Sequence, residues 1–219
     1  MKYPISFLFT HIIVLVITVA CFMMAFPMRD GLPVEHELVV RLEYIQDHLF
    51  IWQLGWISWM LSALGLLLFA TFLASHLPAS QLRTYGLILV ALGIGPDLTA
   101  EVIYAFIIPK LYAVNTSLDV LNMLEVLSVH LTGFLGNGLY NLGGLLLNVL
   151  LIRSAIVATW ISWSGIVAWI LGIGLSLSIA AGSFAGAEIF TALSMVLSTA
   201  WMLLIAHTLF VKTDVVHSS

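Results

Sequence analysis

Six long apolar stretches divide this chain, and they limit its fold more than any other feature. They can be drawn at residues 4–27, 49–75, 84–109, 123–152, 155–181 and 184–211. A helix needs about 20 apolar residues to cross the hydrocarbon core of a bilayer, and each stretch is long enough. Only 8% of the 219 residues are charged, whereas charged residues make up roughly a quarter of soluble domains. The sequence therefore predicts an all-α, polytopic membrane protein, a single six-helix transmembrane bundle over residues 1–219 in contact with the lipid bilayer.

The connections between these stretches differ in length. Residues 35–48 place three apolar side chains on one helical face: Leu38, Leu42 and Ile45. This pattern predicts an amphipathic helix at the membrane interface in the first outer connection. The last two stretches are separated by only Gly182 and Ser183, which predicts a tight turn.

The basic residues indicate an orientation. One side of the predicted bundle carries Lys2, Arg83, Arg153 and Lys212, and the other carries Arg29, Arg41 and Lys110. Because cytoplasmic loops are enriched in Lys and Arg, we expect the first set, and with it both chain termini, to be cytoplasmic. The net charge of −4 gives no indication of a nucleic-acid partner.

The third stretch contains the segment "GIGPDLTAEVIYAF", residues 93–106. A proline inside a helix removes a backbone hydrogen bond and clashes with the preceding turn, so Gly95-Pro96 predicts a kink or a restart that interrupts the third helix. Asp97 would then lie in the first turn of the second half-helix, where free N–H groups favour an anion. Capping is thus one structural explanation for Asp97.

Glu101 has no such explanation. It follows Asp97 by one helical turn and precedes Tyr104 by about one turn, so the three side chains share a face. Two carboxylates this close in a low dielectric cannot both be ionised without a nearby cation. Ionisable groups at membrane depth are energetically costly and therefore mark a functional site by default.

The fourth stretch has a polar face. Its side chains recur at steps of three and four: His130, Phe134, Asn137, Asn141, Gly144 and Asn148. The neighbouring face carries Gly133, Gly136, Tyr140 and Gly143, and glycines let another helix approach closely. Since Asn side chains must find partners in a medium without water, we expect the polar face to point into the bundle or into a cavity there.

These features converge on one candidate site. If the third helix runs outward and the fourth inward, Glu101 and His130 both lie in the outer half of the membrane, and Glu188 near the outer end of the sixth helix can join them. We therefore predict a cluster formed by Asp97, Glu101, His130 and Glu188. Its polar wall would consist of Tyr104, Asn137, Tyr140 and Asn141.

Three roles are compatible with this cluster. A broken helix with carboxylates and amides is similar to the ion and substrate sites of membrane carriers, which predicts binding, sensing or transport of a small ligand, proton or cation. Alternatively, His130, Glu101 and Glu188 bind a divalent metal, zinc or iron, in a metal-dependent intramembrane enzyme. In the third role the side chains only hydrogen-bond the bundle together. The small size also fits a homo-oligomer or an accessory subunit of a membrane complex.

Two further histidines, His11 and His207, lie near the inner face on the first and sixth stretches. Two facing imidazoles could ligate a b-type haem. The more ordinary arrangement, which we favour, is two separate histidines, one bonded within the bundle and one at the interface. The chain has one cysteine, which excludes a Cys-based metal cluster within a protomer.

The segment "HLTGFLGNGLYNLGGLLLNVLLIRSAIVATWISWSGIVAWIL" combines a His before Phe-Leu-Gly, a glycine-rich middle, an Arg-Ser turn and a Trp at the start of the next helix. These residues are His130, Phe134, Leu135, Gly136, Gly143, Gly144, Arg153, Ser154 and Trp160. The pattern resembles the later part of a bacterial membrane family known as domain of unknown function 4386, although Ala158-Thr159 replaces the usual proline before the Trp. The resemblance implies a six-helix protein of the bacterial inner membrane and leaves its activity open.

Overall fold

The computed structural model describes residues 4–34 and 36–210. Every regular element within these residues is a helix, and six helical spans are long and apolar enough to cross a membrane. They are Ile5–Ala25, Leu49–Ser75, Gln81–Ala113, Leu118–Ser154, Thr159–Ala180 and Phe184–Phe210. The six predicted spans are thus confirmed to within a few residues, and the chain is a multi-pass integral membrane protein.

The spans are built from α-helical and π-helical segments. The α-helices are α1 (Ile5–Ala25), α2 (Leu38–Asp47), α3 (Leu49–Ser75), α4 (Gln81–Val102), α5 (Ile108–Ala113), α6 (Leu118–Val129), α7 (Asn137–Ser154), α8 (Thr159–Ala180) and α9 (Phe184–Ile205). A short 3-10 turn, η1 (Arg29–Gly31), follows α1. The π-helical segments are η2 (Ile103–Ile107), η3 (His130–Gly136) and η4 (Ala206–Phe210). Segment η2 connects α4 to α5, η3 connects α6 to α7, and η4 continues α9 beyond Ile205.

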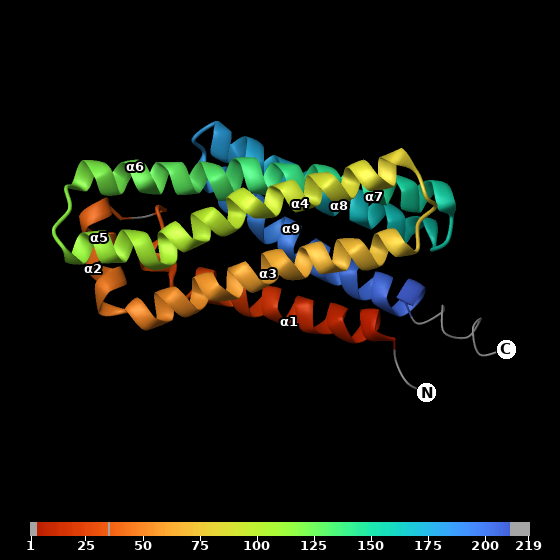
Figure 1. The fold of residues 1–219 in the computed structure, drawn as a ribbon, viewed down its shortest axis with the longest axis horizontal. Helices are drawn as coiled ribbons and strands as arrows, with labels where there is room; N and C mark the ends of the chain where they lie inside the picture. The colour runs from red at the N-terminus through yellow and green to blue at the C-terminus, as the bar shows by residue number, and fades with distance from the viewer. Residues whose placement is uncertain (1–3, 35, 211–219) are drawn as a thin grey trace.

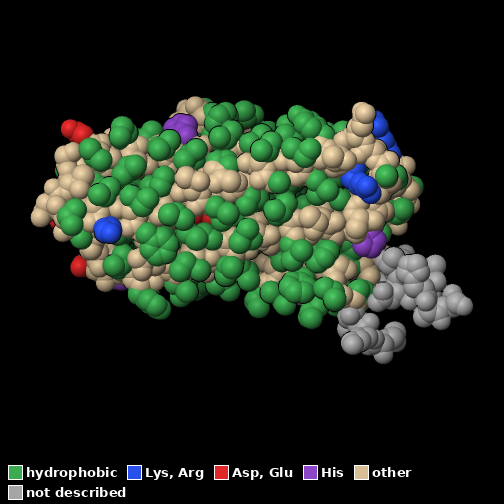
Figure 2. Space-filling model, in the orientation of Figure 1, with side chains coloured by type: hydrophobic (Ala, Val, Ile, Leu, Met, Phe, Trp, Pro, Cys, Tyr) green, Lys and Arg blue, Asp and Glu red, His purple; other side chains and the backbone are tan. Residues whose placement is uncertain are grey.

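The spans lie along the long axis of an elongated bundle (Figure 1). At one end, called the α2 end below, α2 lies with α5 and the start of α6. At the other, called the terminal end, α1 begins and η4 ends. Hydrophobic side chains cover most of the face shown in Figure 2, and one small acidic patch is visible among them, away from both ends.

Helix α2 confirms the predicted amphipathic helix, but it packs onto the bundle. Leu42 and Ile45 are buried, and they join Trp52, Tyr104 and other side chains in a hydrophobic cluster at the α2 end. The chain breaks at His48 before α3 begins. The apolar face of α2 is therefore satisfied by protein contacts.

Helices α4 and α7 approach each other through glycines. A Cβ built on Gly93 would lie 2.6 Å from the carbonyl oxygen of Gly136, and one built on Gly143 would lie 2.5 Å from that of Gly86. This confirms the close approach predicted from the glycine-rich face of the fourth span. Asp97 lies beside this contact, since a Cβ on Gly136 would meet its Cβ at 3.1 Å.

The predicted turn between the last two spans is also confirmed. Gly182 has φ +71°, a left-handed conformation that glycine adopts without steric cost. Ser183 accepts a hydrogen bond from the Gly186 backbone N–H and so caps α9. The turn sets α8 and α9 side by side.

Candidate functional site

The third span is not broken at its proline. Helix α4 runs continuously from Gln81 to Val102 with Pro96 inside it, so the predicted restart at Gly95-Pro96 is wrong. The Thr99 hydroxyl donates to the Gly95 carbonyl oxygen at 2.9 Å and satisfies one backbone group near the proline. The span departs from α geometry further along, at η2. Asp97 therefore caps no half-helix, and the capping explanation fails.

Both predicted carboxyl groups of this span are buried. Asp97 is 6% exposed and Glu101 is 2% exposed. The Thr132 hydroxyl of η3 donates to Asp97 Oδ1, whereas Glu101 Oε2 has no hydrogen-bond partner among the described residues. Buried polar atoms in native structures nearly always have a partner, so an unpartnered carboxyl oxygen inside a span calls for a bound proton, a water molecule or an ion.

Two π-helical segments flank these carboxyl groups. Segment η2 begins just after Glu101, and η3 contains Thr132. A π turn adds a residue to the helix and rotates the following side chains, and such segments occur frequently at functional sites. Here η3 places Thr132, and not His130, opposite Asp97.

His130 lies outside the site. It is exposed, and its Nδ1 atom is hydrogen-bonded to the Val126 carbonyl oxygen at 2.8 Å. The prediction extrapolated the α-helical spacing of the asparagines back to His130. That spacing fails because η3 shifts the register between the two halves of the span.

Glu188 is also separated from the carboxyl pair. It accepts a hydrogen bond from Arg29 Nη1 at 3.2 Å at the surface, where both side chains are about two-fifths exposed. No group of three or more His, Cys, Asp and Glu side chains that could hold a metal ion occurs in the described part of the chain. The predicted cluster of four is therefore not formed, and neither is the predicted zinc or iron site at His130, Glu101 and Glu188.

The asparagines of the fourth span point into the bundle as predicted, but they face α8. Asn137 Nδ2 donates to the Gly172 carbonyl oxygen and to Ser176 Oγ, both at 3.0 Å. Asn141 Nδ2 donates to the backbone oxygen and to Oδ1 of Asn137, both at 2.7 Å. Asn148 Nδ2 donates to the Ser162 carbonyl oxygen at 2.6 Å. Asn137 therefore joins α7 to α8, and Asn141 bonds to Asn137 beside Gly172 of α8. Neither side chain forms the predicted wall of the carboxyl site.

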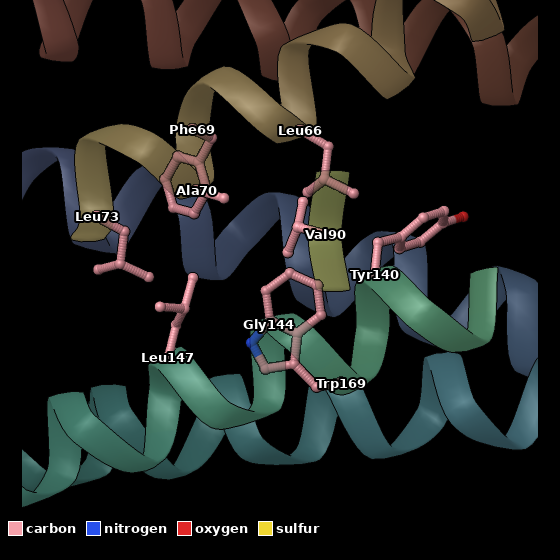
Figure 3. Close-up of a pocket in the computed structure, with 9 residues that line it drawn as sticks. All are labelled: Leu66, Phe69, Ala70, Leu73, Val90, Tyr140, Gly144, Leu147 and Trp169. Atoms are coloured by element: carbon pink, nitrogen blue, oxygen red, sulfur yellow. The ribbon is translucent and has the colours of Figure 1, made fainter. Parts of the chain in front are cut away.

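The two predicted tyrosines lie near the pair. Tyr104 is 4% exposed, and its ring stacks on Trp56 with centroids 4.6 Å apart. The phenol of Tyr140 is within electrostatic range of Asp97 and Glu101. Figure 3 shows Tyr140 at the edge of a cavity of about 10 Å³, with its hydroxyl pointing away from the other lining residues. That cavity has room for about one water molecule.

Sequence reasoning missed a buried ion pair at the α2 end. Arg41 Nη1 donates to Glu125 Oε1 and Nη2 donates to Oε2 at 2.7 Å, while Nε donates to the His36 carbonyl oxygen at 2.9 Å. Arg41 is 5% exposed and Glu125 is 8% exposed. The sequence did contain an indication of this pair. Arg41 lies within the apolar face of α2, and Glu125 lies within an apolar helix.

Further hydrogen bonds hold α2 in place. The Tyr44 hydroxyl donates to the Pro27 carbonyl oxygen at 2.7 Å, and Gln46 Nε2 donates to that of Pro109 at 2.6 Å. Burial raises the pKa of Tyr44, and the charge of Asp30 raises it further. The phenol therefore stays protonated and remains a donor at neutral pH. With the Arg41 ion pair, these bonds fix α2 against the segment that follows α1 and against the third and fourth spans.

The two histidines near the terminal end are in contact, so their predicted separation is wrong. The Nε2 atoms of His11 and His207 lie 3.3 Å apart, and His11 Nδ1 is hydrogen-bonded to the Phe7 carbonyl oxygen at 2.9 Å. The two imidazole nitrogens that bind a haem iron from opposite sides would be about 4 Å apart. The observed distance leaves no room for a haem between them.

We expect the Thr132 hydroxyl to contribute to stability through Asp97. Thr132→Val keeps the side-chain shape but removes the donor, and should lower the free energy of unfolding by about 1 kcal/mol. Thermal unfolding in detergent measures this loss. Thr18→Val is the control, because its exposed hydroxyl bonds only to its own helix. Equal stability of the two variants would show that the contact to Asp97 contributes nothing.

Fold and site together define an integral membrane protein whose six helical spans enclose a pair of carboxyl groups. No protein-family model matches the chain, and neither a curated protein nor a solved structure does.

Proposed function

We propose that this protein binds and exchanges a proton at the Asp97 and Glu101 pair, as a carrier or sensor in the membrane. The proposal rests on the burial of Glu101, whose side chain is 2% exposed and whose Oε2 atom has no partner in the described chain. An isolated carboxylate in this environment is very unfavourable, and a bound proton or small cation removes that cost.

The surroundings of the pair favour a very small ligand. Asp97 and Glu101 are both almost fully buried, and neither lines the cavity of about 10 Å³ beside Tyr140, so an organic substrate has no open site at the pair. The buried guanidinium of Arg41 is already bound by Glu125, so it does not neutralise Glu101. Two acids with one neutral donor, Thr132, form a site suited to holding a shared proton.

Polar groups extend from the pair toward the α2 end. Tyr104 follows Glu101 along the span toward α5, and it is within electrostatic range of Arg41 and Glu125 at the α2 end. The buried indole N–H groups of Trp56 and Trp59 have no partner in the described residues. Trp56 stacks on Tyr104, three residues beyond Glu101, and a buried donor without a partner is a place where transient water can bind, which supports proton access from the α2 end.

The distribution of basic residues supports the proposed orientation. Of the basic residues at the α2 end, Arg29 and Arg41 are paired with Glu188 and Glu125. Basic side chains are visible at the terminal end in Figure 2, and Lys2 and Lys212 lie outside the described residues. Both termini would then be cytoplasmic. Residence in a bacterial inner membrane, and membership of the family known as domain of unknown function 4386, remain part of this proposal.

Proton flux into liposomes tests the function. The protein is reconstituted with a trapped pH-sensitive dye, and a potassium diffusion potential drives protons across the bilayer. We expect Glu101→Gln to lower the flux at least about tenfold, because Gln holds the same space but cannot release a proton. Glu43→Gln and His130→Ala are controls, since both side chains are exposed, and they should keep the full flux.

Proton binding without flux would identify a sensor. Infrared difference spectra then show the band of a protonated carboxyl group that disappears in Glu101→Gln. If Glu101→Gln and Asp97→Asn leave both flux and this band unchanged and alter only thermal stability, the pair is structural and the proposal fails. A flux that depends on sodium or potassium and not on pH would show that the transported ion is a metal cation and not a proton.

A further inference from the structure

The contact between His11 and His207 joins the first and last spans at the terminal end. His11 belongs to α1 and His207 to η4, and their Nε2 atoms are 3.3 Å apart. The ring of Phe7 packs against both imidazoles, with centroid distances of 4.3 Å and 4.9 Å. The carboxyl pair lies on another span, so nothing in this contact depends on the proton site.

The hydrogen bond to Phe7 determines the tautomer of His11. A carbonyl oxygen only accepts, so the His11 Nδ1 atom at 2.9 Å must carry the proton. In the neutral ring the Nε2 atom then presents its lone pair toward His207. An Nδ1–H bond to a backbone carbonyl is also the interaction that orients metal-binding histidines.

The distances between the rings match two ligands of one tetrahedral ion. Two nitrogens at about 2.0–2.1 Å from a tetrahedral Zn²⁺ are about 3.3 Å apart, and their ring centroids are about 5.2 Å apart. A straight N–H···N bond of the same length would separate the centroids by about 5.6 Å. The observed values are 3.3 Å and 5.2 Å, which agree with the tetrahedral arrangement better than with a straight hydrogen bond.

We propose that His11 and His207 bind a divalent transition-metal ion with the coordination of Zn²⁺, and that this ion joins α1 to η4. Imidazole nitrogen suits zinc, copper and nickel, and a tetrahedral arrangement favours zinc. No further His, Cys, Asp or Glu of the described chain completes a group of three. Water would occupy the remaining positions, because His207 is exposed close to the end of its span at Phe210, and an open site of this kind exchanges its ion.

Cobalt titration of the purified, full-length protein without a polyhistidine tag tests this site. Tetrahedral Co²⁺ has a visible absorption that reports binding, and Zn²⁺ should displace it. We expect about one ion per chain and an affinity at least about tenfold lower in His11→Ala or in His207→Ala. The losses in the two single variants should not add in the double variant, because both ligands serve one ion. His48→Ala is the matched control, since His48 is exposed at the α2 end.

Two further measurements keep the outcome clear if a variant unfolds. Zn²⁺ should raise the thermal midpoint of the native chain and of His48→Ala, and should leave that of His11→Gln unchanged. X-ray absorption of the zinc-loaded native protein should show two imidazole ligands. Binding that survives in both single variants, or zinc without imidazole scattering, overturns the proposal.

Discussion

Replacing Arg41 by Met should lower the free energy of unfolding by about 3–5 kcal/mol, the cost of leaving one partner of a buried ion pair unpaired. Glu125 is 8% exposed and accepts both of its side-chain hydrogen bonds from Arg41. The substitution would also remove the donor to the His36 carbonyl oxygen. Because this pair connects α2 to α6, the α2 end should open first on heating.

The double variant separates charge from packing. Arg41→Met combined with Glu125→Leu removes both charges and should recover most of the lost stability, since an apolar pair can replace a buried ion pair at little cost. Lys110→Met is the control, because Lys110 is an exposed basic residue at the same end. Unfolding in detergent measures all four proteins. If the double variant is as unstable as Arg41→Met, the loss comes from the packing of α2 and not from an unpaired carboxylate.

Gly93→Ala should be the second most damaging change, at about 1–3 kcal/mol. Its Cβ would lie 2.6 Å from the Gly136 carbonyl oxygen and 2.8 Å from the Tyr140 backbone nitrogen. Backbone atoms in helices cannot rotate away as a side chain can, so α4 and α7 must separate. That separation would also pull Thr132 from Asp97 and weaken proton binding.

Gly95 is the matched control for this prediction. It lies in the same helix, and a Cβ added there would meet nothing within 4 Å apart from its chain neighbours. Gly95→Ala should change stability by less than about 1 kcal/mol, because the helix preference of alanine is opposed by the contact of its Cβ with the ring of Pro96. Thermal unfolding and the liposome assay of the two variants provide the comparison. Equal behaviour of Gly93→Ala and Gly95→Ala would mean that the close approach of α4 and α7 is unimportant.

The spans could be predicted because their cause is local. A stretch of about 20 apolar residues must satisfy its own backbone in lipid, and a helix does so without any knowledge of the rest of the chain. The same applies to the turn at Gly182 and to the amphipathic pattern of α2. Asp97 and Glu101 were recognisable for the same reason, since acidic residues stand out in an apolar stretch.

The hydrogen-bond partners of the acidic side chains were not predictable, because they depend on helix register and on contacts between distant segments. Extending α-helical spacing along the fourth span selects His130, whereas the π-helical η3 brings Thr132 to Asp97. Glu188 faces Arg29 because the start of α9 packs near η1, which no spacing rule shows. Arg41 and Glu125 meet across 84 positions of the sequence.

Hydropathy alone thus decides where the chain crosses the bilayer and where an ionisable group is out of place. Which side chains meet is decided by the way the helices pack: the glycines that bring α4 to α7, the π segments that rotate a helix face, and the return of η4 beside α1 that joins His207 to His11. These are interactions between distant segments, and each depends on the position of a whole helix. The physical reason is that burial in lipid acts on every residue separately, whereas a binding site requires several residues to be held in place at once.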